Sequence, residues 1–261
     1  MTLSSTKELT DLQRALQSRL GENARFDPYT RILYSTDASN YQIEPIGVYY
    51  PRRDDDLSRV VEVAREVGVP LLARGAGTSL AGQAVGRALI LDCARHLDKI
   101  HRLVPEEALA EVGPGVVGAA LNAAARPHGL MFGPDPASAD RATFGGMIAT
   151  NATGAHSIRY GMTADHLLEA EVVLSDGSTA RLGPVGEEAA RHKAEASTLE
   201  GRIYRRALDV RASAVDQVRR DWPRVWRRAS GYSLDYLTGF SPSQPSGWYL
   251  DPEPYPPPRG F

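Results

Sequence analysis

Apolar residues recur at helical spacing in several parts of the chain. In residues 4–20 they form one stripe, and Gly21 follows where a helix would end. The members of this stripe are Leu9, Leu12, Leu16 and Leu20. The same spacing predicts further helices over residues 54–68, 117–129 and 187–226. The last of these is charged and only weakly helical in its pattern up to residue 204, and we expect it to continue at least as far as Pro223.

Short apolar runs bounded by turn formers predict strands between these helices. The predicted strands cover residues 48–51, 69–73, 88–92 and 110–116, and a hairpin pairs 169–174 with 179–182. Over residues 48–92 the expected order is therefore strand, helix, strand, glycine-rich loop and strand.

Composition and charge narrow the class of protein. The chain has 261 residues, enough for one large domain or two small ones, and its net charge of −2 recruits neither nucleic acid nor an acidic membrane. Its single cysteine, Cys93, excludes an internal disulfide. Neither an apolar leader nor a run of about 18 apolar residues is present. We therefore expect a cytoplasmic chain without a transmembrane segment, with peripheral attachment to the inner face of the membrane left open.

The most informative segment is the loop after the strand at 69–73. It runs from Arg74 to Gln83 and contains three glycines and two hydroxyl residues. Glycine lets the backbone approach a ligand closely, and successive N–H groups form an anion-binding nest. Arg74, Thr78 and Ser79 add donors and positive charge. This composition suits a pyrophosphate cradle, while a glycine-rich turn without any ligand stays the alternative for the loop taken alone.

A second glycine cluster runs from Gly133 to Gly161. It contains Pro-Asp-Pro-Ala-Ser at 134–138, Gly-Gly-Met-Ile-Ala-Thr-Asn at 145–151 and Arg-Tyr-Gly at 159–161. Its small residues and its amide and hydroxyl donors suit a flat polar ligand that lies against backbone.

Together the two clusters resemble the PCMH-type FAD-binding domain of the vanillyl-alcohol-oxidase superfamily. Arg-Gly-Ala-Gly-Thr-Ser-Leu and the three motifs of the second cluster are similar to the branch of GlcD-like D-lactate, glycolate and 2-hydroxyglutarate dehydrogenases. The resemblance covers residues 34–183. It differs from the Rossmann fingerprint, whose glycines open a helix within a βαβ unit. The resemblance implies an α+β fold made of two α+β subdomains.

The resemblance also implies where FAD binds. The first loop would hold the pyrophosphate, residues 134–138 and 145–154 would line the isoalloxazine and ribityl region, and residues 159–161 would close the second wall. The implied cofactor-binding residues are Arg74, Gly75, Ala76, Gly77, Thr78, Ser79, Leu80, Gly82, Gln83, Pro134, Asp135, Ser138, Gly145, Gly146, Thr150, Asn151, Gly154, Arg159, Tyr160 and Gly161. Some relatives attach the flavin through a histidine at the position that Thr78 occupies here, so we expect noncovalent FAD.

By resemblance, the expected function is that of the FAD-binding part of an oxidoreductase that oxidises a 2-hydroxy acid by transfer to flavin N5. The acid belongs to the D-lactate, glycolate or 2-hydroxyglutarate class, and no residue of the chain selects among them. Two alternatives stay open: a PCMH-type enzyme acting on another alcohol or sugar, and a non-catalytic module that binds FAD or a nucleotide. No catalytic residue is assigned, and without an HxH or HExxH pattern we assign no metal.

The family pattern also leads us to expect an N-terminal piece of a longer oxidoreductase, whose substrate domain and electron acceptor or iron–sulfur module lie elsewhere. The expected parts are a lead-in over residues 1–46, FAD subdomains over 47–105 and 106–238, and a proline-rich tail over 239–261.

Several single residues have two interpretations. Among the six histidines only His156 lies inside the second glycine cluster, and for it both a surface position and a position beside the flavin stay open. Asp135 suits a turn cap at least as well as a contact to flavin. Cys93, inside an apolar run, suits a small buried hydrophobe better than a catalytic thiol.

Other segments allow a structural explanation. The resemblance implies that residues 34–41 form a site wall on the approach to the flavin, and a solvated turn stays equally open. The acidic run 54–56 suits helix capping better than metal binding. The basic and aromatic residues of 219–228 suit a solvated helix face better than nucleic-acid binding. His96 and His101 are expected in a loop, and His166 and His192 have no partner pattern beside them.

Overall fold

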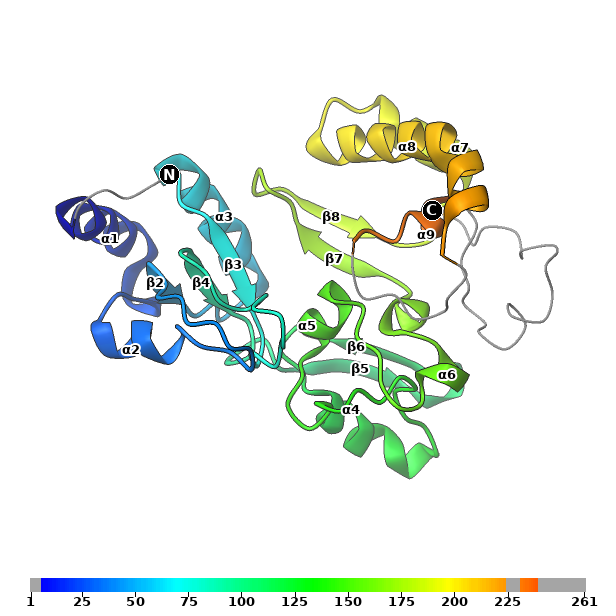
Figure 1. Cartoon of the computed structure of the whole chain (residues 1–261), viewed down its shortest axis with the longest axis horizontal. Coiled ribbons are helices and arrows are strands. Elements are labelled where there is room, and N and C mark those ends of the chain that lie inside the picture. Colours follow the sequence, from blue (N-terminus) through cyan, green and yellow to red (C-terminus); the bar gives the residue numbers. More distant parts are fainter. Residues whose placement is uncertain (1–5, 224–230, 239–261) are drawn as a thin grey trace. The chain divides into compact units, whose positions relative to one another are not determined.

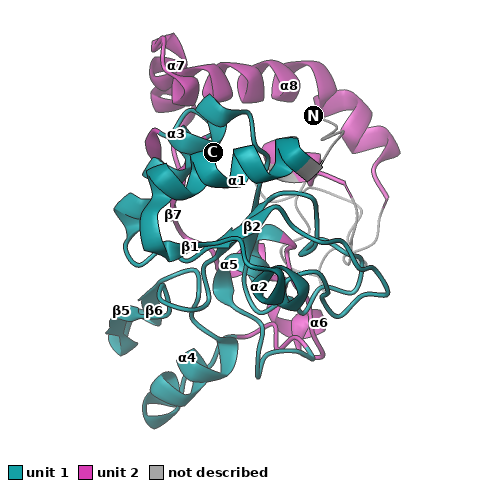
Figure 2. Ribbon diagram, turned by 90° about the vertical axis from the view of Figure 1, so that its left-hand side faces the viewer, with its two compact units in different colours: residues 1–132, 137–149, 175–177 teal, residues 133–136, 150–174, 178–261 magenta. Residues whose placement is uncertain are grey.

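The computed structural model describes residues 6–223 and 231–238. Its contacts divide the chain into two compact units (Figure 2). Unit 1 takes the described residues of 1–132, 137–149 and 175–177, and unit 2 takes those of 133–136, 150–174 and 178–261. These contact-based units do not correspond to the expected FAD subdomains, whose boundaries stay a prediction.

Unit 1 contains a four-stranded mixed sheet with strand order β1-β2-β4-β3, of which Figure 1 labels β2, β3 and β4. The strands are β1 (Ala24–Arg25), β2 (Gly47–Tyr49), β3 (Leu71–Arg74) and β4 (Leu89–Asp92). β1 runs antiparallel to β2, while β4 lies parallel to both β2 and β3. In this register Arg74 lies opposite Asp92, at the ends of their strands.

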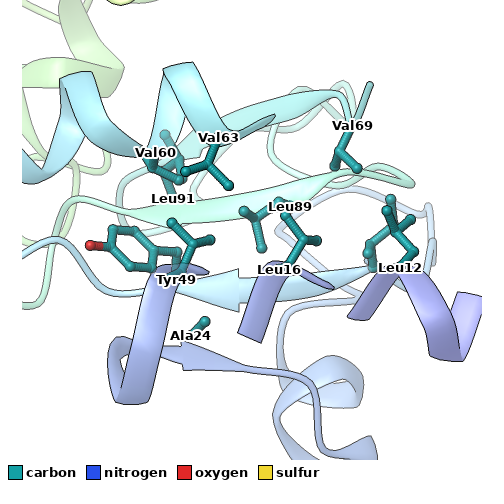
Figure 3. Close-up of a cluster of buried hydrophobic side chains, with 11 residues drawn as sticks. Leu12, Leu16, Ala24, Tyr49, Val60, Val63, Val69, Leu89 and Leu91 are labelled. Atoms are coloured by element: carbon teal, nitrogen blue, oxygen red, sulfur yellow. The ribbon is translucent and has the colours of Figure 1, made fainter. Parts of the chain in front are cut away.

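The main core lies between this sheet and two helices, α1 (Thr6–Leu20) and α3 (Asp54–Val67). Every residue of β2 and β4 is buried, which explains why these strands read as continuous apolar runs. Figure 3 shows Leu16 of α1 and Val60 of α3 around Leu89 of β4, and all three side chains are fully buried. The leucine stripe predicted for α1 therefore faces the core.

The acidic start of α3 caps the helix, as its sequence predicts. One carboxylate oxygen of Asp56 accepts hydrogen bonds from the backbone N–H groups of Arg52, at 2.8 Å, and Arg53, at 3.2 Å. These are N–H groups that the helix itself leaves without an acceptor. The helix ends at Gly68, whose φ of +74° is the left-handed conformation favoured at a C-cap.

Unit 1 also holds smaller elements. The helices are α2 (Pro28–Leu33), α4 (Gly118–Ala125) and α5 (Phe144–Ala149), and β5 (Ile100–Val104) pairs antiparallel with β6 (Leu109–Val112). Short 3-10 turns cover Gly21–Asn23, Pro105–Glu107 and Arg126–His128.

Unit 2 contains a β-hairpin and a pair of helices. Its elements are α6 (Ser157–Tyr160), a 3-10 turn (Thr163–His166), β7 (Ala170–Val173), β8 (Thr179–Leu182), α7 (Glu187–Glu195), α8 (Leu199–Asp221) and α9 (Leu234–Thr238). Its own cluster of buried side chains joins Ala190 and Ala194 of α7 to Tyr204 of α8. Among the helices of residues 6–223 and 231–238, none combines the length and the apolar character of a membrane span.

The mixture of helices and sheets confirms the expected α+β class, and the helices at 54–68 and 117–129 and the 170–182 hairpin form as predicted. Three differences stand out. His101 lies in β5 and not in a loop; the predicted 187–226 helix is interrupted at residues 196–198; and α8 ends at Asp221, before Pro223. Residues 224–228 and the proline-rich segment 239–261 lie outside the described residues.

Candidate functional site

The loop after β3 needs glycine at three positions for steric reasons. A Cβ on Gly75 would lie 2.0 Å from Oγ1 of Thr143, and one on Gly82 would lie 2.7 Å from the ring of Tyr41. A Cβ on Gly77 would lie 2.6 Å from Nη2 of Arg74. Gly77 and Gly82 also have φ values of +69° and +78°, which disfavour any side chain. The glycines therefore allow the backbone of this loop to pack closely against the side chains of Thr143, Arg74 and Tyr41.

The backbone of this loop presents donors. Within the part of the chain that the structure describes, no protein acceptor is hydrogen-bonded to a backbone N–H group between Gly75 and Gln83. Thr78 and Ser79 are half-buried, whereas Leu80 is 81% exposed. Because backbone N–H groups normally find an acceptor, a run of such donors is the arrangement expected of an anion nest.

The side chain of Arg74 holds backbone together. Its Nη1 donates to the carbonyl oxygens of Tyr34, at 3.2 Å, and Ala84, at 2.9 Å, and its Nη2 donates to that of Thr36, at 2.8 Å. The guanidinium also lies over the Tyr34 ring, 5.2 Å from the centroid. Burial lowers the pKa of Arg74, and the nearby Tyr34, Asp37 and Asp92 oppose this shift.

Tyr34 links this arginine to the sheet. Its hydroxyl donates to Oδ2 of Asp92 at 2.5 Å, and Oδ1 of the same carboxylate accepts from the N–H of Ala94 at 2.9 Å. Burial and the hydrogen bond to Asp92 raise the pKa of Tyr34, so its hydroxyl stays protonated and donates. Asp92 is itself buried, and these bonds satisfy it.

Residues 34–42, which include the predicted wall or turn at 34–41, lie against the glycine loop, and the choice between these two interpretations stays open. The N–H of Ala38 donates to the carbonyl of Gly77 at 3.0 Å, and Asp37 accepts from the N–H groups of Ser39, at 2.8 Å, and Ala84, at 3.3 Å. Burial raises the pKa of the Asp37 carboxyl, but the hydrogen bonds from Ser39 and Ala84 and the charge of Arg74 outweigh it, so the pKa lies below its ordinary value.

Part of the second glycine cluster lies in unit 1 and contacts the first loop. Gly145 and Gly146 lie in α5, whose start is held by hydrogen bonds from Phe144 to Val116 and from Gly145 to Pro114. Thr143, just before the helix, is buried against Gly75, and its Oγ1 has no hydrogen-bond partner among the described residues. The sequence analysis missed Thr143, although its position before Phe-Gly-Gly was a signal. Ser138 precedes this helix, and its carbonyl closes a turn with Arg141 and Ala142.

The rest of the second cluster lies in unit 2, where Gly154 contacts Asp135. A Cβ on Gly154 would lie 1.7 Å from the carbonyl oxygen of Asp135, whose own φ is +49°. The buried hydroxyl of Ser157 donates to the carbonyl of Pro134 at 3.2 Å and accepts from the N–H of Gly154 at 2.9 Å. Ala155 completes the junction with a hydrogen bond to Asp135. Ser157 is a second residue that the sequence analysis missed.

Asn151 and Gly161 shape the turns that follow. Asn151 has a φ of +46°, and its Oδ1 accepts from the N–H of Ala164 at 2.9 Å. Gly161 has a φ of +86° and lies against Asp165, which accepts from the N–H of Met162 at 2.8 Å. Thr150 directly precedes Asn151, after the end of α5.

Several polar side chains in and near the second glycine cluster are partly exposed and contact one another. Nδ1 of His156 lies 3.3 Å from a carboxylate oxygen of Asp135, and the Arg159 guanidinium lies 5.6 Å from the centroid of the Tyr160 ring. His166, for which the sequence shows no partner, lies 2.8 Å from the carbonyl oxygen of Tyr160. This contact joins residues whose pairing no local pattern predicts.

Cys93 packs against the main core of unit 1. Burial and the charge of Asp92 raise the pKa of its thiol to about 11, so it is protonated at neutral pH. This supports the role of a small buried hydrophobe. In the described part of the chain, no group of three His, Cys, Asp or Glu residues is placed to hold a metal ion.

Both glycine clusters lie within one matched region. A family model described as "FAD binding domain" matches residues 45–183, which is more than half of the chain. The chain belongs to this family. The match confirms the FAD-binding domain that the two clusters predict, and residues 34–42, which contact the first loop, precede the matched region.

Curated relatives of this FAD-binding family include dehydrogenases and oxidases of 2-hydroxy acids. The chain is 36% identical over 214 residues to D-2-hydroxyglutarate dehydrogenase of Pseudomonas putida, a match that covers 81% of this chain and 21% of the relative. It is 36% identical over 158 residues to glycolate oxidase subunit GlcD of Bacillus subtilis, covering 59% of this chain and 33% of the relative. The chain therefore spans about a fifth to a third of the relatives' length. The resemblance to this branch is confirmed.

Solved structures show the same fold. p-Cresol methylhydroxylase with bound substrate matches with a TM-score of 0.58 and 20% identity, over 71% of this chain and 36% of that one. 4-Ethylphenol oxidase from Gulosibacter chungangensis matches with a TM-score of 0.57 and 22% identity, over 68% and 35%. These matches confirm the PCMH-type fold predicted from the sequence.

Proposed function

We propose that the chain is the FAD-binding part of a flavin-dependent oxidoreductase that oxidises a 2-hydroxy acid. The observation that carries the cofactor site is the run of backbone N–H groups between Gly75 and Gln83, which donate to no protein acceptor among the described residues. The names of the relatives, D-2-hydroxyglutarate dehydrogenase and glycolate oxidase subunit GlcD, support the substrate class. D-Lactate belongs to the same class, and a further relative, from Archaeoglobus fulgidus, carries the name D-lactate dehydrogenase.

The residues present fit FAD. Between Gly75 and Gln83 the backbone N–H groups donate to no acceptor among the described residues, which suits a diphosphate, and the Thr78 and Ser79 hydroxyls add donors. We propose that the remaining candidates of the second cluster hold the rest of the cofactor: Pro134, Asp135, Ser138, Gly145, Gly146, Thr150, Asn151, Gly154, Arg159, Tyr160 and Gly161. When bound, FAD supplies the two-electron acceptor for the hydrogen on the carbon that carries the hydroxyl.

The cofactor site is tested with one glycine variant. Gly77→Ala places a methyl group against Arg74 in a left-handed conformation, and we expect FAD affinity to fall at least tenfold. Gly86→Ala is the matched control, because its Cβ would meet only the flexible Leu72 side chain at 3.4 Å. The readout is the flavin absorbance that the purified protein retains after excess FAD is removed. The proposal is contradicted if the native chain is folded by circular dichroism but retains no flavin, or if Gly77→Ala retains as much flavin as the native chain.

Noncovalent attachment is proposed because Thr78 stands where some relatives carry the linking histidine. Unfolding the flavin-loaded protein in acid should release all of the yellow colour into the supernatant. Colour that stays with the precipitate contradicts this part of the proposal.

Because the substrate domain is expected to lie outside this chain, the substrate class is tested on the flavin-loaded oxidoreductase that contains both parts, mixed with D-2-hydroxyglutarate, glycolate or D-lactate without oxygen. Loss of the oxidised-flavin absorbance with one of these acids is the expected result. Bleaching only by another alcohol or a sugar favours the other PCMH-type chemistry, and no bleaching by any of them favours a module that only binds.

The electron acceptor or iron–sulfur module, and a cytoplasmic location with or without membrane attachment, stay predictions.

A further inference from the structure

We infer that Arg74 is a positioning residue that preforms the FAD loop before the cofactor arrives. This inference rests on the proposed function, because it explains how the proposed cradle keeps its shape. The sequence analysis expected the guanidinium to add positive charge for the pyrophosphate. In the structure the guanidinium instead donates to backbone carbonyls, two of them in the segment 34–42 and one at Ala84, directly after the loop.

The first step is the reach of the guanidinium. Its three hydrogen bonds join the carbonyls of Tyr34 and Thr36, in the segment 34–42 that lies against the loop, to the carbonyl of Ala84, which directly follows the loop. A planar guanidinium presents its N–H groups as a rigid fork, which is how one side chain binds three carbonyls at once. Tyr34 and Thr36 are more than 40 residues away from Ala84 in the sequence, so their positions relative to Ala84 depend on such a long-range contact.

The second step is the anchor. Arg74 and Asp92 are opposite each other in the parallel pair β3–β4, so their side chains emerge on the same face of the sheet. Tyr34 connects them, with its ring beneath the guanidinium and its hydroxyl on Asp92. The arginine is therefore linked to β4, a strand in which every residue is buried.

The third step is the consequence for the loop. Gly77 lies directly against the guanidinium, and its carbonyl accepts from Ala38. Asp37 accepts from the N–H of Ala84. With Arg74 in place, both ends of the loop are tied to residues 34–39, and the N–H groups between them keep their direction. This is preorganisation of a binding site by a side chain that does not itself need to contact the ligand.

The test is amide hydrogen exchange on the full chain without FAD. In Arg74→Gln we expect the amides of Ala38 and Ala84 to exchange at least tenfold faster, while those of β2 and β4 keep their rates. Arg74→Lys should restore part of the protection, because an ammonium reaches only some of the three carbonyls. The control is Arg87→Gln, which removes the same charge from an exposed arginine close to the loop and should leave both amides unchanged.

Two results would overturn the inference. Unchanged exchange at Ala38 and Ala84 together with weakened FAD binding would make Arg74 a direct ligand of the diphosphate. Faster exchange throughout β2 and β4 in both Arg74 variants would make it a general stability residue. Hydrogen exchange is measured without FAD, so it tests only the role of Arg74. The proposed function is tested separately, by whether the native chain binds flavin.

Discussion

Gly154 and Asp135 are in direct backbone contact: a Cβ on Gly154 would lie 1.7 Å from the carbonyl oxygen of Asp135. Asp135, which supplies this oxygen, has a φ of +49°, and such a positive value is uncommon for residues other than glycine. Close approach and unusual conformation therefore occur at the same junction. Backbone that is held in this way is common at ligand sites.

This junction predicts a strong effect of Gly154→Ala. The new methyl group cannot be accommodated without moving backbone, so we expect the free energy of unfolding to fall by more than about 2 kcal/mol. Urea unfolding measures the loss, and an FAD titration of the folded fraction should show at least a tenfold weaker affinity. Gly86→Ala should change neither, since its Cβ meets a flexible side chain at ordinary contact distance. A Gly154→Ala protein as stable as the native chain would contradict the observed packing.

Ser157→Ala should destabilise the same junction by removing a hydroxyl. The variant leaves the carbonyl of Pro134 and the N–H of Gly154 without their buried partner, which costs about 1–3 kcal/mol. Thermal unfolding measures the change. Ser213→Ala on the exposed face of α8 is the control and should stay within about 0.5 kcal/mol of the native protein. Equal effects of the two variants would remove the role assigned to Ser157.

Tyr34→Phe should alter stability at alkaline pH. The pKa of Tyr34 is raised above its ordinary value of 10.0, so above about pH 10 the unfolded chain loses this proton while the folded chain keeps it. The stabilising contribution is complete below pH 10 and declines as the pH rises further. The phenylalanine variant should be less stable at neutral pH, because Asp92 loses a donor, and its stability should fall less steeply above pH 10.

Unfolding at several pH values between 7 and 12 measures this difference for the Tyr34 variant. Tyr29→Phe is the matched control, since the Tyr29 side chain is 71% exposed. Burial also raises the pKa of Tyr49, so a residual alkaline decline is expected in every variant. An identical pH profile for Tyr34→Phe and the native protein would contradict the prediction.

Cys93 should react slowly with thiol reagents. Its pKa of about 11, against an ordinary value of 9.0, lowers the thiolate fraction at neutral pH by a factor on the order of 100. Iodoacetamide labelling followed by mass spectrometry measures the rate, and no other cysteine competes for the label. Labelling in denaturant is the reference. Equal rates in the folded and unfolded chain would show that the thiol is not protected.

Periodicity predicted the elements whose faces are clearly apolar. The leucine stripe of α1 and the acidic start and glycine end of α3 are local signals, and both helices form where the sequence places them. β5 was missed because polar His101 and Arg102 interrupt its alternation, and its antiparallel partner β6 decides its conformation. α5 was missed because Gly145 and Gly146 disfavour helix, while the carbonyls of Val116 and Pro114 hold its start.

The chemistry of the site was predictable as residue types and less so as contacts. Glycine at 75, 77 and 82 predicted close approach of the loop backbone to a ligand, which stays a prediction, and the structure shows these glycines packed against protein side chains. The acceptors of Arg74 lie 10, 38 and 40 residues away, so no local pattern reveals them. Thr143 packs against Gly75 and Ser157 donates to Pro134, and these contacts also join residues that lie far apart in the sequence. The sequence thus indicates which loops bind, and the fold decides which side chains support them.

The two units have an implication for dissecting this protein. The second glycine cluster changes unit after residues 136 and 149, and the three residues 175–177 of the β7–β8 turn belong with unit 1. Neither unit is one uninterrupted piece of sequence, so no single cut liberates either of them whole. Fragment complementation, domain transplantation and circular permutation therefore have to treat the segment from Gly133 to Gly177 as a shared part that stays with both halves.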